Sequence, residues 1–387
     1  MLRIGIVAGE TSGDIIAADF IKAVKGISPD VQFEGVAGPL MREAGCKALF
    51  TTEQMSVMGF VEVLKRLPEL LKLRKQLAQH FIQNPPDVFV GVDAPDFNLA
   101  LERKLKQHNI PTVHYVSPSA WAWRTYRVKK IARSFDLMLS LLPFEADFYN
   151  KHGVDARFVG HPMADHIPFE NSQSDALQKL GLSDQKRTVA LLPGSRGSEV
   201  NHILPLLLAS ANHAEQTQND LHFVIPAATV KLKQSIEAMV QELAKDLSVT
   251  VLDGKAREAM LASELVLLCS GTATLEAMLL KRPMIITFRT SRISYWIFKA
   301  LTVVKHIGLP NFFDDSHPVP EFIQDEATAE NVGEAMLEYL NNEEKRSDMI
   351  RNFQTYHESL KKNASQQAAQ TVLQLIEEKN ATAVRAR

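Results

Sequence analysis

The sequence predicts an α/β protein with two successive domains, each built on a parallel sheet. Three observations support this prediction. The 387 residues are more than one ordinary hydrophobic core needs. Short apolar runs alternate with amphipathic stretches from the first residue onward. This alternation pauses once near the middle of the chain and then resumes.

The first set of apolar runs predicts buried parallel strands of a doubly wound sheet, with helices between them. These strands are Ile4–Ala8, Asp87–Val92, Thr112–Val116, Leu137–Leu141 and Arg157–Val159. The polar stretch Phe169–Asp175 has little periodicity and predicts a linker between the domains.

A second set of strands is predicted after the linker, and the chain is helical from Glu334 onward. These strands are Thr188–Leu192, His222–Ile225, Thr250–Leu252, Leu265–Cys269 and Met284–Thr287. Ligands of such sheets bind outside the carboxyl ends of the strands, so we expect function in the loops that follow them.

The composition is that of a globular protein, with 45% hydrophobic and 23% charged residues. A net charge of −2 gives no whole-chain attraction to nucleic acid, which we do not expect as a partner. The two cysteines, Cys46 and Cys269, favour a reducing cytoplasm over a disulfide framework or a cysteine metal site. The start of the chain resembles a buried strand more than a signal peptide, and no apolar run is long enough to predict a membrane span.

The first predicted strand leads into the loop Ala8–Asp14, which opens a helix. Its glycines permit a tight turn and close approach of the backbone to a ligand, but their spacing is not the dinucleotide fingerprint. Two acids, Glu10 and Asp14, beside the hydroxyl of Ser12 suit a sugar better than a pyrophosphate, so we expect these residues to bind an acceptor sugar. The alternative is a plain turn in which Ser12 or Asp14 caps the helix.

The strand Asp87–Val92 delivers Asp93 to its carboxyl end, just before Pro95 and Asp96 start the next helix. A partly desolvated carboxylate in this position can take a proton from a hydroxyl. Asp93 is therefore a candidate general base, whereas Asp96 is better suited to capping the helix.

The loop after Thr112–Val116 contains Ser117, Trp121, Trp123 and Arg124. Aromatic faces for stacking, with polar groups at the rim, are typical of a carbohydrate-binding surface. We expect Ser117 and Trp121 to contact substrate. The alternative is that the tryptophans pack at a domain interface.

In the second half, a loop after Thr188–Leu192 contains Gly194, Ser195 and Arg196 and then opens a helix. Backbone N–H groups, a hydroxyl and a guanidinium together can hold a diphosphate leaving group. The alternative is a capped loop with a surface arginine.

The loop after Leu265–Cys269 repeats this pattern with Gly271 and Thr272 and adds Glu276 one turn into the helix. A carboxylate there can accept two hydrogen bonds from a ribose diol. Glu276 could otherwise be only a helix-capping acid, although the S/T-x-x-E spacing is missed. Two phosphate-type loops and a ribose-type acid in one domain predict a site for a nucleoside diphosphate.

The stretch Ser56–Leu77 is apolar and basic, with five Lys or Arg against two glutamates, and Pro68 is predicted to divide it into two helices. Basic amphipathic helices bind anionic membrane surfaces with their apolar face buried. The predicted membrane contacts are Val61, Val63, Leu64, Leu67, Leu70 and Leu71. The alternative is an ordinary core helix.

Together these stretches resemble the lipid-A-disaccharide synthase family along nearly the whole chain. The matching segments are VAGETSGD, VMGFVEVL, PDVFVGVDAPDFN, HYVSPSAWAWR, LPFEADFY, FVGHPMAD, LLPGSR and SGTATLEA. The resemblance implies the GT-B architecture, in which two Rossmann-like domains face each other across a cleft. It also implies an acceptor domain at 1–165, a UDP-sugar domain at 166–340, and C-terminal helices at 341–387 that pack back on an N-terminal domain, within one chain or exchanged in a homodimer.

The resemblance further implies an inverting transfer from UDP-2,3-diacylglucosamine to 2,3-diacylglucosamine 1-phosphate (lipid X) in lipid A biosynthesis. No metal or cofactor is implied, and the enzyme would act at the cytoplasmic face of the inner membrane. In this picture Asp93 deprotonates the acceptor 6-hydroxyl, Arg196 with Gly194 and Ser195 stabilises the departing UDP, and Glu276 holds the ribose. Asn311 matches a family position, and the resemblance extends nucleotide contact to Glu321 and Gln324.

Other functions remain open on the sequence alone. A UDP-N-acetylglucosamine 2-epimerase shares the two-domain fold and the ribose-binding acid but has no second substrate. Another GT-B transferase would act on a different lipid-linked acceptor, and a non-enzymatic lipid- or nucleotide-binding protein would release no UDP. A dehydrogenase is disfavoured, because neither glycine loop has dinucleotide spacing.

Overall fold

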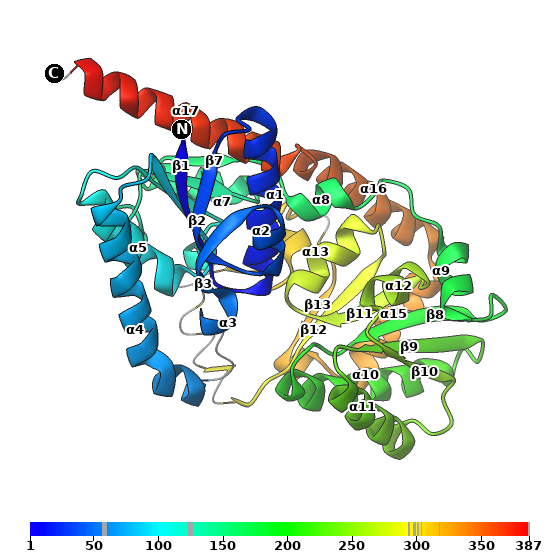
Figure 1. Cartoon of the computed structure of the whole chain (residues 1–387). Helices are drawn as coiled ribbons and strands as arrows, with labels where there is room; N and C mark the ends of the chain where they lie inside the picture. The colour runs from blue at the N-terminus through cyan, green and yellow to red at the C-terminus, as the bar shows by residue number, and fades with distance from the viewer. Residues whose placement is uncertain are drawn as a thin grey trace. The chain divides into compact units, whose positions relative to one another are not determined.

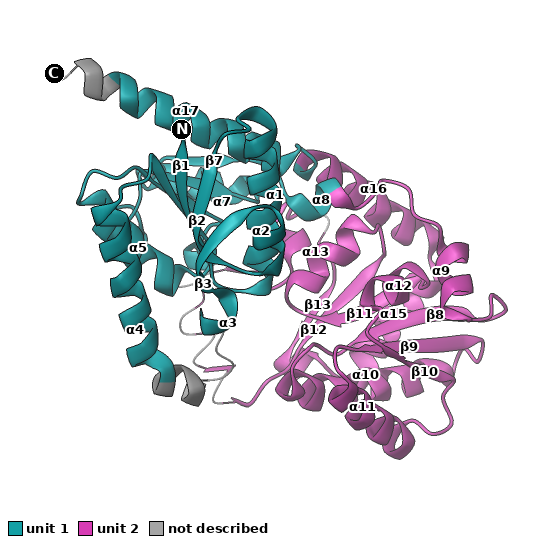
Figure 2. Ribbon diagram, in the orientation of Figure 1, with its two compact units in different colours: residues 1–165, 360–387 teal, residues 166–359 magenta. Residues whose placement is uncertain are grey.

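The computed structural model describes residues 1–55, 60–122, 127–292, 295–296, 299, 302, 304–316 and 318–385, with side chains left out at 60–65 and 382–385. The chain forms two compact units. Unit 1 contains Met1–Asp165 and Leu360–Arg387, and unit 2 contains His166–Ser359 (Figure 2).

Unit 1 is built on a sheet with the strand order β3-β2-β1-β4-β5-β6-β7, in which neighbours pair in parallel (Figure 1). Its strands are β1 Arg3–Ala8, β2 Gln32–Ala37, β3 Cys46–Thr51, β4 Val88–Val92, β5 Thr112–Tyr115, β6 Leu137–Ser140 and β7 Ala156–Phe158. Its helices are α1 Thr11–Ile27, α2 Pro39–Glu43, α3 Thr52–Met55, α4 Phe60–Gln83, α5 Pro95–Lys106, η1 Ser119–Trp121, α6 Val128–Ile131, α7 Pro143–Lys151 and α17 Ala364–Arg385. Parallel neighbours require crossover connections, and the helices supply them.

Unit 2 repeats this design with the strand order β10-β9-β8-β11-β12-β13. Its strands are β8 Arg187–Leu192, β9 Leu221–Ala227, β10 Val249–Asp253, β11 Leu265–Cys269, β12 Met284–Phe288 and β13 Glu321–Ile323. Its helices are α9 Gln173–Leu180, α10 Gly197–Glu215, α11 Val230–Leu243, α12 Ala256–Leu261, α13 Thr272–Leu279, η3 Leu309–Phe312, η4 Gln324–Glu326 and α15 Ala329–Asn341. Two helices, α8 Pro162–His166 and α16 Glu343–Leu360, each end where the chain passes from one unit to the other.

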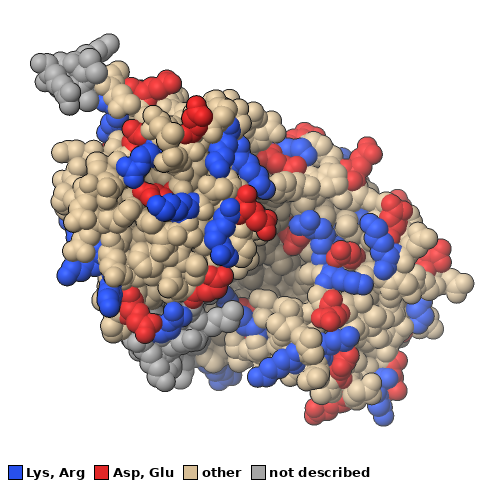
Figure 3. Space-filling view, viewed as in Figure 1, with Lys and Arg blue, Asp and Glu red and all other residues tan. Residues whose placement is uncertain are grey.

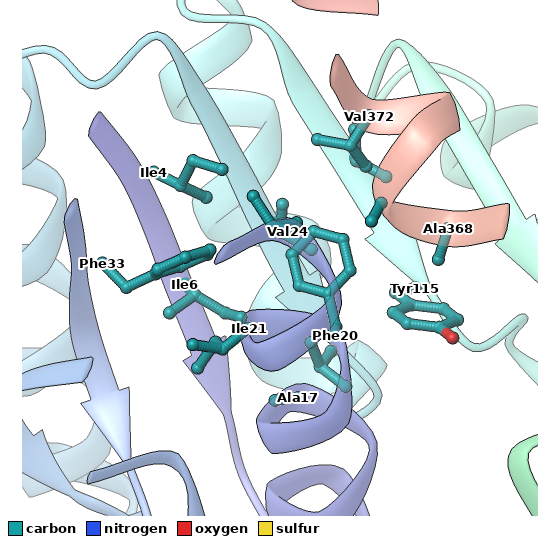
Figure 4. Packing of buried hydrophobic residues seen from close by; sticks show 14 of the residues in the cluster. Ile4, Ile6, Ala17, Phe20, Ile21, Val24, Phe33, Tyr115, Ala368 and Val372 are labelled. Carbon is teal, nitrogen blue, oxygen red and sulfur yellow. The ribbon is translucent and has the colours of Figure 1, made fainter. Parts of the chain in front are cut away.

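The C-terminal helix α17 belongs to the core of unit 1. Figure 4 shows Ala368 and Val372 beside Phe20 and Val24 of α1 and the ring of Tyr115, and all five are buried. Residues four apart lie on one face of a helix, so the spacing of Ala368 and Val372 turns a single stripe of α17 toward the sheet. The compact units change at a different residue from the predicted border at 341: α16 belongs to unit 2 almost to its end, and Leu360–Arg387 joins unit 1.

The predicted strands all lie within or close to observed ones, whereas β2, β3 and β13 were not predicted. β2 and β3 carry Gly35 and Lys47 and lack a continuous apolar run, and β13 has only three residues. The predicted division at Pro68 is wrong, because α4 runs through this proline. A proline inside a helix removes one backbone hydrogen bond, which a long helix tolerates when its apolar face is packed.

Candidate active site

The candidate loops lie where the strand order reverses in each sheet. In unit 1, β1 pairs with β4 and brings Ala8 opposite Val92, so the loop containing Glu10 and the turn containing Asp93 leave the same edge. In unit 2, β8 pairs with β11, and the Arg196 and Gly271 loops leave one edge in the same way. Such switch points are the usual ligand sites of open parallel sheets.

Asp93 follows β4 in an unusual backbone conformation. Its φ is 53° and that of Ala94 is 45°, so two consecutive residues with side chains occupy the left-handed region. The Asp93 N–H donates to the Tyr115 carbonyl over 2.8 Å. The side chain is half-buried, and among the described residues nothing hydrogen-bonds to its carboxylate or pairs with it. The carboxylate is thus presented at the sheet edge with both oxygens available to a substrate hydroxyl.

The loop after β1 divides its polar residues between two tasks. Glu10 and Ser12 are exposed. Asp14 is 2% exposed, and its carboxylate accepts hydrogen bonds from the N–H groups of Leu40 and Met41 at the start of α2, over 3.0 and 3.1 Å. Asp14 therefore caps α2 and not α1, the helix to which it belongs. Contact between Asp14 and a substrate remains a prediction.

A pocket of about 290 Å³ opens beside this loop in unit 1. It is lined by Glu10, Thr11, Asp14, Pro39, Leu40, Thr52 and Glu53. The exposed carboxylates of Glu10 and Glu53 and the exposed Thr11 hydroxyl can hydrogen-bond sugar hydroxyls, and the two carboxylates repel phosphate.

Trp121 is held by a buried acid that the sequence did not single out. Its indole N–H donates to Glu145 over 3.0 Å, and its ring meets Phe144 edge to face at 4.9 Å between centroids. Burial raises the pKa of Glu145 to about 7, although hydrogen bonds from Trp121 and the Leu142 N–H act in the opposite direction. Ser117 is also buried, whereas Trp123 and Arg124 lie outside the described residues. The only sequence signal for Glu145 was its place in the segment LPFEADFY.

The loop after β8 is organised by Glu199 of α10. One Glu199 oxygen accepts from the N–H groups of Ser195 and Arg196 over 2.9 and 3.2 Å, and the other pairs with the Arg196 guanidinium over 3.1 Å. Gly194 has a φ of 114°, and a Cβ there would lie 2.5 Å from the carboxylate. Two of the amides expected to hold a diphosphate are thus already bound by a carboxylate. Phosphate binding at this loop remains a prediction, and it would require the phosphate to displace this carboxylate or to bind beside it, next to the 79% exposed Arg196 side chain.

The loop after β11 begins with Gly271, whose φ of 139° favours glycine. Thr272 is exposed at the start of α13. Glu276, one turn later, accepts a hydrogen bond from Arg257 over 2.7 Å with one oxygen, and its side chain is 21% exposed. The second oxygen of this carboxylate makes no contact among the described residues, so it is available for a diol.

Asn311 and Glu321 bind each other and the loop between them. The Asn311 amide donates to Glu321 over 2.7 Å and exchanges two hydrogen bonds with the Val319 backbone. Glu321 also accepts from the N–H groups of Ile307 and Gly308. These contacts use the polar atoms of Asn311, which is 2% exposed, to hold the loop.

Gln324 is similarly occupied. It is 9% exposed, has a φ of 52°, and exchanges hydrogen bonds of 2.7 and 3.0 Å with the Thr290 backbone. Direct nucleotide contact by Asn311, Glu321 and Gln324 remains a prediction, and each has a structural task.

Three of the predicted membrane contacts of α4 have described side chains, and these differ in exposure. Leu67 and Leu71 are 43% and 45% exposed, whereas Leu70 packs partly against the core of unit 1. The side chains of Val61, Val63 and Leu64 lie outside the described residues. Among the described helices none has both the length and the apolar character to cross a membrane.

Charges on the surface in Figure 3 alternate in sign, and no single-sign field covers that face. In the described part of the chain, no group of three or more His, Cys, Asp or Glu side chains is arranged to hold a metal ion.

Comparison with known proteins identifies the family. A family model described as Lipid-A-disaccharide synthetase matches residues 4–372. A lipid-A-disaccharide synthase of Pseudoalteromonas translucida is 48% identical over 377 residues, covering 97% of each chain. That of Hahella chejuensis is 47% identical over 376 residues, covering 97% of this chain and 95% of its own.

Solved structures share the fold at low sequence identity. The UDP-GlcNAc 2-epimerase of Neisseria meningitidis, bound to UDP-GlcNAc, has a TM-score of 0.63 at 14% identity over 96% of this chain and 100% of its own. This similarity confirms the predicted GT-B fold and nothing beyond it. The family model and the two relatives show that the chain belongs to the lipid-A-disaccharide synthase family of glycosyltransferases.

Proposed function

We propose that this chain transfers 2,3-diacylglucosamine from its UDP derivative to the 6-hydroxyl of 2,3-diacylglucosamine 1-phosphate. The products are the β(1→6)-linked disaccharide 1-phosphate of lipid A biosynthesis and UDP. The observation that carries this proposal is family membership over nearly the whole chain, since relatives with 47–48% identity over 97% of it bear the name lipid-A-disaccharide synthase.

Asp93 is proposed as the general base. As the new bond between the acceptor oxygen and the donor anomeric carbon forms, the 6-hydroxyl proton passes to the Asp93 carboxylate, and the bond to the UDP oxygen breaks. Its position at the switch point of unit 1 and its carboxylate, unbound among the described residues, support this role.

The departing UDP carries the developing negative charge, and the proposed stabilising group is the loop after β8. The exposed Arg196 guanidinium supplies a permanent positive charge, and Ser195 and the start of α10 supply further donors. Glu276, with one unbound oxygen, is proposed to accept hydrogen bonds from the ribose.

Both substrates carry acyl chains, so the enzyme is proposed to act while bound to the cytoplasmic face of the inner membrane. Support comes from Leu67 and Leu71 on α4, which are exposed beside exposed Lys72 and Lys75. Apolar side chains next to lysines are the pattern of a surface that binds anionic lipid.

The test is UDP release from UDP-2,3-diacylglucosamine with and without the 1-phosphate acceptor. We expect release only with the acceptor, and Asp93→Asn should lower kcat by about 10²–10⁴-fold with UDP affinity unchanged. Asp96→Asn is the matched control, because Asp96 lies three residues away with a 90% exposed side chain. Consumption of the UDP-sugar without acceptor would instead favour an epimerase, and an Asp93→Asn enzyme with near-normal kcat would remove Asp93 as the base.

A further inference from the structure

Asn98 of α5 is buried directly beneath the turn that carries Asp93. Its side chain is 0% exposed. The amide nitrogen donates to the Asp93 carbonyl over 2.8 Å and lies 3.4 Å from the carbonyls of Val92 and Val7. One side chain therefore connects the turn, the end of β4 and β1.

The turn itself needs such support. Left-handed backbone is unfavourable at a residue with a side chain, and here Asp93 and Ala94 both adopt it. The N–H groups of Phe97 and Asn98 bind the Ala94 carbonyl, each over 3.0 Å, and so fix the helix start. Among the described residues, the Asp93 carbonyl accepts a hydrogen bond only from the side-chain amide of Asn98.

The carboxylate of Asp93 has no partner of its own in the described part of the chain. Its direction is therefore decided by the backbone at Asp93 and not by a neighbouring side chain. A displacement of about 1 Å of a reacting group can lower turnover by about 100-fold. Any group that holds this backbone consequently controls the chemistry.

We propose that Asn98 is a positioning residue, which locks the left-handed turn at Asp93 and Ala94 and thereby aims the Asp93 carboxylate at the acceptor hydroxyl. This inference rests on the proposed function. An amide is suited to the task because its NH₂ group donates to carbonyls, whereas a carboxylate would repel them and a leucine would leave them unpaired. Close packing adds to the constraint, since a Cβ at Gly91 would lie 3.1 Å from the Asn98 Cβ.

The experiment measures UDP release, UDP affinity and amide hydrogen exchange of residues 93–98 in Asn98→Ala, with Asp93→Asn as reference. We expect kcat to fall at least about tenfold, with the acceptor KM within about threefold, UDP affinity unchanged and exchange of the turn accelerated. Asn150→Ala is the matched control, because its amide also binds main chain in unit 1, at Ala156, but away from the turn. It should keep normal kcat and normal exchange at 93–98.

A second pair of variants tests the turn itself. Glycine has no penalty in the left-handed region, so the kcat cost of Asn98→Ala should be smaller in an Ala94→Gly background than in the Ala94 background. If Asn98→Ala fails to fold, the isosteric Asn98→Asp serves, since it can donate to the Asp93 carbonyl only when protonated. Its kcat relative to that of the unaltered enzyme should fall as pH rises.

The outcomes separate the inference from the proposed function. If the unaltered enzyme releases no UDP with both substrates, the proposed function is wrong, and hydrogen exchange still decides whether Asn98 holds the turn. If the unaltered enzyme is active and Asp93→Asn is inactive, an Asn98→Ala enzyme with kcat within twofold of normal overturns the inference. Equal costs in the two backgrounds, or a loss of UDP affinity matching the loss of kcat, overturn it as well.

Discussion

Gly9 and Ala94 approach each other so closely that a Cβ on Gly9 would lie 2.6 Å from the Ala94 Cβ. Gly9 begins the loop after β1, and Ala94 is half of the left-handed turn after β4. The two loops at the switch point of unit 1 therefore interlock. The glycine in the first loop is required by the shape of the turn that carries the proposed base.

Gly9→Ala should consequently lower kcat by about tenfold or more, because the added methyl group has to displace Ala94 and with it Asp93. UDP affinity should not change, since the proposed nucleotide loops belong to unit 2. The measurement is steady-state kinetics together with UDP titration.

Gly26→Ala is the control for this prediction. Apart from its chain neighbours and the backbone of its own helix, no described atom lies within 4 Å of a Cβ at Gly26 in α1, so alanine should raise stability by about 0.5–1 kcal/mol and leave kcat alone. Equal kinetics of the two variants would show that the close contact does not position Asp93.

Arg196→Ala should weaken UDP binding by about 10- to 100-fold, since a charge-assisted hydrogen bond contributes about 1.5–3 kcal/mol. Thermal stability should hardly change, because the side chain is 79% exposed and an exposed ion pair contributes little. Arg351→Ala removes another exposed arginine of unit 2 that pairs three residues away, with Asp348, and should bind UDP normally. Calorimetric titration with UDP compares them, and unchanged affinity in Arg196→Ala would remove this residue from the nucleotide site.

The sequence predicts where a candidate residue lies when its place follows from the strand before it, but it does not reveal hydrogen-bond partners elsewhere in the fold. Asp93 directly follows the apolar strand β4 and Arg196 lies in the loop after the apolar strand β8, so their place at the sheet edges could be predicted. Asp14 was assigned to a ligand loop, but the N–H groups that it caps are 26 and 27 residues away.

Hydrogen-bond partners that the sequence does not reveal explain two other differences. Asn311 and Glu321 carry polar groups that suit a nucleotide, yet they bind each other across a ten-residue loop. Glu199 lies only three residues after Arg196, but the sequence does not show that the loop folds back over it and places two amides on its carboxylate.

Glu145 should make stability depend on pH. Its pKa is about 7 in the folded chain against about 4.5 unfolded, because burial favours the protonated form. A raised carboxyl pKa contributes stability that is fully present below about pH 4.5 and is lost as pH rises through about 7, on the order of 3 kcal/mol at most.

Glu145→Gln should remove that part of the pH dependence, so that denaturant unfolding at pH 5 to 8 shows a shallower slope than in the unaltered protein. Glu43→Gln, an exposed acid of the same unit, should leave the slope unchanged. Parallel slopes for Glu145→Gln and the unaltered protein would mean that this carboxyl is ionised at neutral pH.

The exposed leucines of α4 give the last prediction. Leu67→Ser with Leu71→Ser should reduce binding to phosphatidylglycerol vesicles in a sedimentation assay, because two apolar side chains leave the lipid-facing surface. The melting temperature should stay within a few degrees, since both residues are already exposed. Leu73→Ser on the same helix reverses the pattern: this leucine is 8% exposed, so its loss should destabilise unit 1 by about 2–5 kcal/mol while the folded fraction still binds vesicles. If the double variant melts early and Leu73→Ser does not, α4 uses Leu67 and Leu71 for packing rather than for lipid.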